Sequence, residues 1–201
     1  MIILASKSPR RKELLENAGF DIRILVSDAD ENIDEDNPIE LVKKLSYIKA
    51  KAVYDEISKK VSDSLSEQTK VCEKAEDRYI VLGADTVVYA NGEILGKPKD
   101  KEDARRMVKM YSGAYHSVYT GFSLISSDGK IVSDYCETKV FVYDMSDDEI
   151  EEYISTDEPY DKAGAYGIQG LFGKYVEKIE GDYNNVVGLP VSKIVHTLKN
   201  F

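Results

Sequence analysis

One near-continuous apolar run spans 80–88 and has the sequence Gly-Ala-Asp-Thr at its centre. A run of this length predicts a β-strand that is buried on both faces. An unpaired carboxylate in such a strand would cost several kcal/mol, on the order of the usual penalty for a buried charge. We therefore expect Asp85 either to contact a cation or to lie where the strand opens into a cleft.

The remaining pattern predicts an α/β fold in which short strands alternate with amphipathic helices. Strands are expected at 2–5, 22–26, 116–125 and 131–143, helices at 9–18, 38–57, 101–111, 147–155 and 191–198, and hairpins at Asn91-Gly92 and Glu180-Gly181. The whole chain, 1–201, is interpreted as a single domain. Residues 58–78 are polar and carry no motif, so they are expected to be a helix extension or a surface insertion.

Composition excludes several classes of protein. The chain is 42% hydrophobic and 32% charged, and no apolar run approaches the ~18 residues of a membrane span. No secretion signal precedes the first strand, and Cys72 and Cys136 lack metal-site spacing, so we expect a cytoplasmic protein that contacts no membrane. The formal net charge of -10 argues against binding a nucleic acid polymer. The net charge does not exclude a small anionic ligand that is bound by a local basic cluster.

Such a cluster follows the first strand. Ser8-Pro9 has the composition of a helix N-cap and first helical residue, and Ser6, Arg10, Arg11 and Lys12 surround it. Three cations in a first helical turn oppose the helix dipole, which a bound phosphate would offset. The alternative interpretation is a solvated basic turn.

Four other segments carry candidate chemistry. The acidic loop 28–31 ends in Glu31 and is either simply solvated or contributes to Mg²⁺ binding. Lys49 lies at the margin of a helical apolar stripe, where most lysines only extend to solvent. The Asn91-Gly92 hairpin would return Lys97 toward Asp85. The glycine-rich segment 161–170 allows close backbone approach to a ligand, unless it is a flexible surface turn.

Together these segments resemble the Maf family of nucleoside triphosphate pyrophosphatases. The resemblance rests on ordered motifs at 4–11, 83–88, 95–98, 112–113, 116–121, 161–170 and 188–190. It implies a Maf/ITPase-like α/β fold with a long, twisted, mixed sheet flanked by helices, and a cleft between two lobes. It also implies hydrolysis between the α- and β-phosphates of a nucleoside triphosphate with a divalent metal, Mg²⁺ or Mn²⁺.

The same resemblance assigns roles to individual residues. Asp85 matches the proposed general base, and Arg10, Thr86 and Gln169 match the positions that distinguish enzymes acting on dTTP and UTP from those acting on 7-methyl-GTP. The amide of Gln169 offers a donor and an acceptor to the imide edge of uracil or thymine. We expect Ser6, Arg10, Arg11, Lys49 and Lys97 to hold the triphosphate, and Glu31 and Asp85 to hold the metal.

Three alternatives remain at this point. One is a pyrophosphatase for 7-methyl-GTP or other noncanonical nucleotides. A second is an inosine or xanthosine triphosphate pyrophosphatase, although that family has an Asn and a Lys where this chain has 8–11. The third is a nucleotide-binding regulator of septum formation without turnover. We expect the polar insertion to alter the surface or the contacts of a homodimer.

Overall fold

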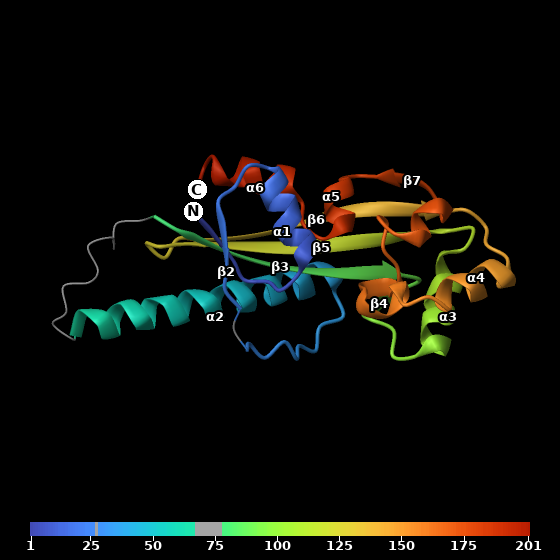
Figure 1. Cartoon of the computed structure of the whole chain (residues 1–201), viewed down its shortest axis with the longest axis horizontal. Coiled ribbons are helices and arrows are strands. Elements are labelled where there is room, and N and C mark those ends of the chain that lie inside the picture. The colour runs from blue at the N-terminus through green and yellow to red at the C-terminus, as the bar shows by residue number, and fades with distance from the viewer. Residues whose placement is uncertain (27, 67–77) are drawn as a thin grey trace.

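The computed structural model describes residues 1–26, 28–66 and 78–201, and within them seven strands form one mixed sheet (Figure 1). The strands are β1 (Ile2–Leu4), β2 (Ile22–Ile24), β3 (Ile80–Ala90), β4 (Glu93–Leu95), β5 (Tyr115–Ser126), β6 (Ile131–Val142) and β7 (Val176–Glu180). Their order is β2-β1-β3-β5-β6-β7, and β4 pairs with β3. The predicted α/β class with a long mixed sheet is confirmed.

Helices flank this sheet. They are α1 (Pro9–Asn17), α2 (Pro38–Ser66), α3 (Lys101–Tyr111), α4 (Asp147–Ile154), α5 (Tyr183–Val187) and α6 (Val191–Leu198), with the short 3-10 helices η1 (Glu158–Asp161), η2 (Ala163–Ala165) and η3 (Leu171–Tyr175). Helix α2 covers one face, and α1 and α6 cover the opposite face (Figure 1). The predicted cap at Ser8 is confirmed, and Ser8, Asp100 and Ser146 each accept a backbone N–H of the helix that follows.

The two edges of β3 are paired differently, and this difference creates the cleft. On one edge β5 pairs with β3 continuously from Ile80 to Tyr89. On the other edge, β1 ends opposite Leu82, and pairing with β4 starts only at Val88, which lies opposite the last residue of β4. Among the described residues no strand pairs with this edge between those two points. The centre of the predicted buried strand therefore borders open space, and the cleft is expected there.

Two glycines bring α2 close to the sheet beside this opening. A Cβ atom at Gly83 would lie 2.2 Å from the carbonyl oxygen of Ser46, and one at Gly121 would lie 2.3 Å from the carbonyl oxygen of Val42. Both distances are far below van der Waals contact, so only glycine permits the helix backbone to pack at this depth. The close packing places Lys49 of α2 next to Asp85.

Separate apolar clusters stabilise the two ends of the sheet. One cluster joins α3, α4 and the 3-10 helices to one end of β3, β5 and β6, and includes Tyr111, Ile154 and Phe172. The other clusters join α1, α2 and α6 to the opposite end, and include Leu15 and Phe122. The predicted arrangement of two lobes with a cleft between them is thus confirmed by how the core divides.

One detail of the sequence prediction is wrong, and one open alternative is decided. Gly181 does not turn a hairpin: the chain enters α5, whose N-cap Asp182 accepts the N–H of Asn184. Helix α2 continues beyond 57 to Ser66, so the first part of the polar segment is a helix extension, while 67–77, with Cys72, lies outside the described residues. None of the helices that the structure describes is long and apolar enough to cross a membrane.

Candidate functional site

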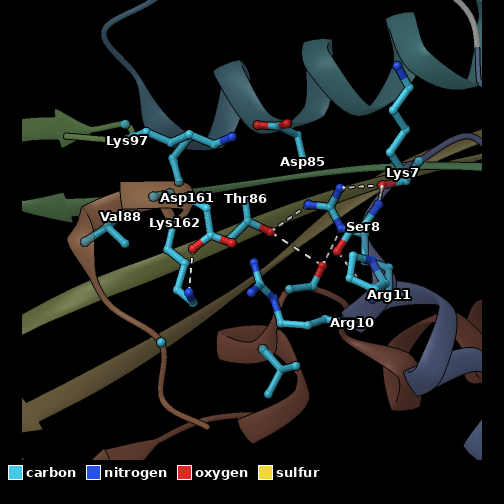
Figure 2. Close-up of a pocket in the computed structure, with 18 of the residues that line it drawn as sticks. Lys7, Ser8, Arg10, Arg11, Asp85, Thr86, Val88, Lys97, Asp161 and Lys162 are labelled. Atoms are coloured by element: carbon cyan, nitrogen blue, oxygen red, sulfur yellow. Dashed lines mark hydrogen bonds and ion pairs between the residues drawn. The ribbon is translucent and has the colours of Figure 1, made fainter. Parts of the chain in front are cut away.

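A cavity of about 990 Å³ opens at the unpaired edge of β3 (Figure 2). Its lining includes every residue that the sequence analysis proposed for the site: Ser6, Arg10, Arg11, Glu31, Lys49, Asp85, Thr86, Lys97 and Gln169. These residues come from both lobes and from segments far apart in the chain. The structure therefore brings together all of the predicted site residues, while their individual roles stay predictions.

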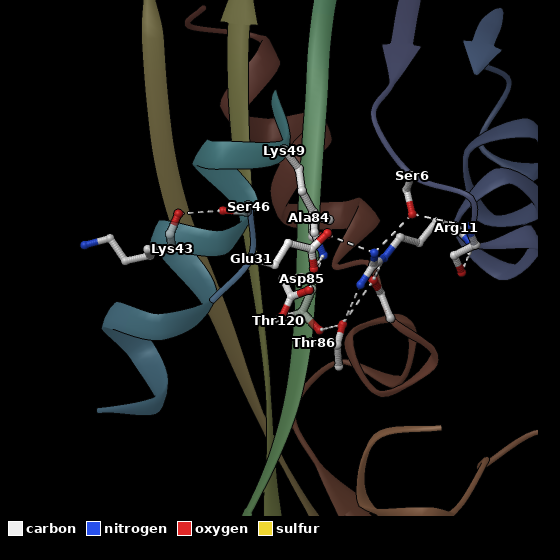
Figure 3. A network of polar contacts seen from close by, with 12 residues as sticks. Ser6, Arg11, Glu31, Lys43, Ser46, Lys49, Ala84, Asp85, Thr86 and Thr120 are labelled. Atoms are coloured by element: carbon white, nitrogen blue, oxygen red, sulfur yellow. Dashed lines mark hydrogen bonds and ion pairs between the residues drawn. The ribbon is translucent and has the colours of Figure 1, made fainter. Parts of the chain in front are cut away.

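Asp85 lies beside a cation on the α2 face of the sheet. The Lys49 ammonium donates to Asp85 Oδ1 at 2.6 Å, and its nitrogen lies 3.0 Å from Glu31 Oε2 (Figure 3). The Lys49 and Asp85 side chains are 16% and 15% exposed, whereas Glu31 is 53% exposed. Since solvent screens exposed pairs, the contact with Asp85 is the stronger of the two. Asp85 meets both expectations for a carboxylate in an apolar strand, because it has a cation and borders a cleft.

Arg11 forms hydrogen bonds with three segments that line the cleft (Figure 3). Its guanidinium donates to the backbone carbonyls of Ala84 at 2.8 Å and Gly188 at 2.9 Å, and to the hydroxyls of Ser6 and Thr86 at 3.2 and 3.1 Å. These bonds use four of the five guanidinium N–H groups. Burial lowers the pKa of Arg11, and the charge of Asp85 acts in the opposite direction. Most of its donors thus bind protein, and direct phosphate contact by Arg11 stays a prediction.

Replacing Arg11 by Lys is expected to lower the free energy of unfolding by about 1–3 kcal/mol, because one ammonium cannot satisfy the buried carbonyls of both Ala84 and Gly188. Denaturant unfolding monitored by circular dichroism measures the change. The control is Arg10→Lys, since Arg10 has no side-chain hydrogen bond in the part of the chain that the structure describes. Equal losses in the two variants would show that the Arg11 network is not what stabilises the fold.

Cations that face the cavity are available to bind an anion. Six basic and five acidic side chains line the cavity. The whole chain has 27 Lys and Arg residues against 37 Asp and Glu residues, so basic residues are in excess in the cavity although acidic residues are in excess in the chain. Within the described ranges, Lys7, Arg10 and Lys97 make no ion pair, and Figure 2 shows Arg10 and Lys97 near the space around Asp85. Ser6 Oγ accepts from the Ser8 N–H and from Arg11, which leaves its own proton free to donate.

Thr86 points away from Asp85, because successive strand residues face opposite sides of a sheet. Its hydroxyl contacts Arg11, the Thr120 hydroxyl at 2.9 Å and the Gly188 carbonyl at 3.5 Å. Thr120 also donates to the carbonyl of buried Asn185 at 3.0 Å. Thr86 therefore connects β3 to the turn after α5, a connection that the sequence prediction missed along with α5 itself.

The glycine-rich segment forms one wall of the cavity. Gln169 is exposed and lines the cavity, and its amide has no hydrogen-bond partner among the residues that the structure describes. Tyr166 anchors the segment to β5, since its hydroxyl lies 2.7 Å from Nε2 of buried His116. Burial lowers the pKa of His116 to about 3, so the ring is neutral at neutral pH. The amide of Gln169 is thus free to bind a ligand from an anchored loop.

The sequence analysis missed Glu158, which also lines the cavity. Its carboxylate accepts the backbone N–H groups of Leu171 at 2.6 Å and Phe172 at 3.4 Å, and the Tyr153 hydroxyl at 3.1 Å. No local sequence signal marks this residue. Its two backbone partners are thirteen and fourteen positions further along the chain, so only the folded structure shows these contacts.

The carboxylates of Asp85 and Glu31 suit a metal ion that a substrate also binds. In the part of the chain that the structure describes, no group of three or more His, Cys, Asp or Glu side chains could hold a metal ion by itself. Asp85 and Glu31 are nevertheless close enough to share one ammonium. Mg²⁺ is commonly held by one or two carboxylates together with substrate phosphates, and this pair meets that requirement.

Comparison with known proteins gives matches over the whole length. A family model described as Maf-like protein matches residues 1–201. A dTTP/UTP pyrophosphatase of Thermoanaerobacter sp. (strain X514) is 46% identical over 199 residues, covering 98% of this chain and 95% of that protein. Another dTTP/UTP pyrophosphatase, from Acetivibrio thermocellus, is 48% identical over 202 residues, covering 100% and 94%.

A solved structure, a nucleoside-triphosphatase / dITP/XTP pyrophosphatase from Mycobacterium abscessus, aligns with 98% of this chain and 93% of that chain. Its TM-score is 0.40 and its sequence identity 10%. At this TM-score and sequence identity, the similarity gives no information about activity.

Proposed function

The chain belongs to the Maf family, and from this premise we propose that it hydrolyses dTTP and UTP to the nucleoside monophosphate and pyrophosphate. The observation that carries the proposal is the position of Asp85. It lies at the unpaired edge of the central strand, in a cavity that also holds Lys49, Lys97 and Arg10. A carboxylate surrounded by cations suits the attack of water on a phosphoanhydride, which needs a base and positive charge at one place.

The basic residues would hold the triphosphate. Arg10 and Lys97 have no protein acceptor among the described residues, and the Ser6 proton is free to donate, so these groups can turn toward phosphate oxygens without breaking an ion pair. Lys49 would exchange part of its contact with Asp85 for a phosphate oxygen. Electrostatic stabilisation of the charge that develops on the phosphates would supply most of the rate, as in other phosphoryl transfers.

Asp85 would orient a water molecule and accept its proton. The oxygen of that water forms the new bond to the α-phosphorus, and the bond from this phosphorus to the bridging oxygen of the β-phosphate breaks. Pyrophosphate then leaves with the electron pair. The second carboxylate oxygen, Asp85 Oδ2, is not used by Lys49, so the base and the ion pair do not compete for one atom.

We propose that Asp85 and Glu31 hold a divalent cation, Mg²⁺ or Mn²⁺, together with phosphate oxygens of the substrate. When bound, such an ion supplies charge neutralisation and polarises the phosphorus that is attacked. Support comes from the two carboxylates that share Lys49.

Gln169 would recognise the base of the nucleotide. Uracil and thymine present an N–H donor between two carbonyl acceptors, and an amide can pair with one of each. A carboxylate can only accept, so Gln169→Glu is expected to lower kcat/KM for dTTP and UTP at least about tenfold, the value of one lost hydrogen bond of about 1.4 kcal/mol. It should favour guanine, whose corresponding edge presents two donors.

The experiment is pyrophosphate release from dTTP, UTP, CTP, GTP, ITP and 7-methyl-GTP with Mg²⁺ or Mn²⁺, for the wild type and Gln169→Glu. Selective turnover of dTTP and UTP that shifts toward guanine nucleotides in the variant supports the proposal. Preference for 7-methyl-GTP or ITP in the wild type would favour the alternative substrates. Binding of UTP without any turnover would favour the regulatory alternative. The homodimer stays a prediction, which light scattering tests.

A further inference from the structure

The loop that follows Gln169 is held by a single carboxylate. Glu158 Oε2 accepts the Leu171 N–H at 2.6 Å, and Oε1 accepts the Phe172 N–H at 3.4 Å. Gln169 is separated from Leu171 by Gly170 alone, and Phe172 is the next residue. Hydrogen bonds to an ionised carboxylate are stronger than neutral ones, so Glu158 restricts the backbone immediately after the residue proposed to read the base.

The glycine in this turn leaves space for the same carboxylate. A Cβ atom at Gly170 would lie 2.2 Å from Glu158 Oε2, well inside contact distance. The φ angle of Gly170 is -105°, which other residues adopt freely. Space for the carboxylate, and not backbone conformation, therefore explains the glycine at this position.

Hydrogen bonds hold both the carboxylate and the backbone carbonyl of Glu158. The hydroxyl of buried Tyr153 on α4 donates to its Oε1 at 3.1 Å, and the Lys162 ammonium donates to its backbone carbonyl at 2.9 Å. The first contact attaches the carboxylate to the core of one lobe, and the second attaches η1 to the glycine-rich segment. A side chain held in this way can transmit the position of α4 to the loop.

We propose that Glu158 is a positioning residue for base recognition: by binding the amides of Leu171 and Phe172 it presents the amide of Gln169 to the base of the nucleotide. This inference rests on the proposed function. All three hydrogen bonds that the carboxylate accepts come from protein groups, so the role assigned to Glu158 is to hold the loop and not to bind the base itself. Preorganisation of a recognition group raises affinity for the matching ligand without new contacts.

The test compares Glu158→Gln with the wild type by steady-state kinetics on UTP, CTP and GTP. An amide supplies one acceptor oxygen where the carboxylate supplies two, so one loop amide loses its partner. We expect KM for UTP to rise about tenfold or more and the preference for UTP over GTP to fall by a similar factor. Binding of inorganic pyrophosphate, which has no base, should not change.

A second variant and a matched control keep the result interpretable. Gly170→Ala displaces the same carboxylate without altering Glu158, and should reduce the preference for UTP in the same way. Combining Glu158→Gln with Gln169→Ala should add little to the loss caused by Gln169→Ala alone, because both act on one recognition step. The control, Glu177→Gln, removes an exposed carboxylate of β7 and should leave the kinetics unchanged.

The outcomes separate this inference from the proposed function. A wild-type protein that neither binds nor hydrolyses UTP selectively would overturn the proposed function and the inference with it. Selective wild-type turnover with unchanged selectivity in Glu158→Gln and Gly170→Ala would overturn the inference alone. A uniform loss of kcat on every nucleotide, together with a lower melting temperature, would also overturn it, since that pattern indicates a purely structural role.

Discussion

Replacing Asp85 by Asn is expected to lower kcat for UTP by roughly 10²–10⁴-fold, the usual contribution of a general base. The substitution keeps the size of the side chain and leaves an oxygen that can still accept from Lys49, whose ammonium lies 2.6 Å from Asp85 Oδ1. It removes the negative charge that takes the proton of the attacking water. Steady-state and single-turnover release of pyrophosphate at saturating Mg²⁺ measure the loss.

The control for this substitution is Asp55→Asn, which removes an aspartate charge on the exposed side of α2, where Asp55 pairs with Lys51. Activity of this variant should stay near the wild-type value. If Asp85→Asn retained full turnover with saturating metal, another group would have to take the proton, and the role proposed here for Asp85 would be wrong. Binding of UTP should persist in the variant, because the phosphate-binding cations are untouched.

Local patterns were sufficient to predict most of the helices and strands. Residues 80–88 have the apolar run of a buried strand, and β3 is found at Ile80–Ala90. Ser8-Pro9 carries cap chemistry in two adjacent residues, and this cap forms as predicted. Each of these signals depends on neighbours in the sequence, which explains why a single chain is enough to predict them.

Predictions that depend on distant partners were incomplete. The Glu180-Gly181 turn has the composition of a hairpin, yet Asp182 caps α5 instead, and no returning strand is formed. Arg11 was predicted only as a phosphate ligand because nothing nearby shows that its partners are Gly188, at a separation of 177 residues, and Ala84, at 73. Glu158 escaped prediction for the same reason.

The predicted site residues nevertheless converge because the sheet has an interrupted edge. The two strands that bound this edge, β1 and β4, are both visible in the sequence as short apolar segments. Their consequence, an unpaired stretch of β3 around Asp85, follows only from the pairing register. Lys49 shows the same limit: its helical position alone gave no function, and only the family resemblance predicted it as a phosphate ligand. The approach of α2 at Gly83 places it against Asp85.

Replacing Lys49 by Met is expected to lower kcat/KM for UTP by roughly 10²–10³-fold, the usual cost of removing one preorganised charge-stabilising donor. Methionine keeps the length and the apolar part of the side chain, so the packing of α2 is preserved. The matched control is Lys51→Met on the same helix, where the lysine is exposed and pairs only with Asp55 among the described carboxylates. Comparable losses in the two variants would mean that charge on α2 in general, and not the position of Lys49, supports activity.

A second measurement separates the two roles of Lys49. Its ammonium lies 2.6 Å from Asp85 and 3.0 Å from Glu31, the same carboxylates that are proposed to hold the metal. Without nucleotide, Lys49→Met should therefore bind Mn²⁺ more tightly than the wild type, because no cation competes for the pair and the two negative charges face each other. Titration of free Mn²⁺ by electron paramagnetic resonance detects this gain. Lower activity together with tighter metal binding would show that Lys49 serves the phosphates and balances the carboxylates until substrate arrives, whereas unchanged metal affinity would place the metal away from Asp85 and Glu31.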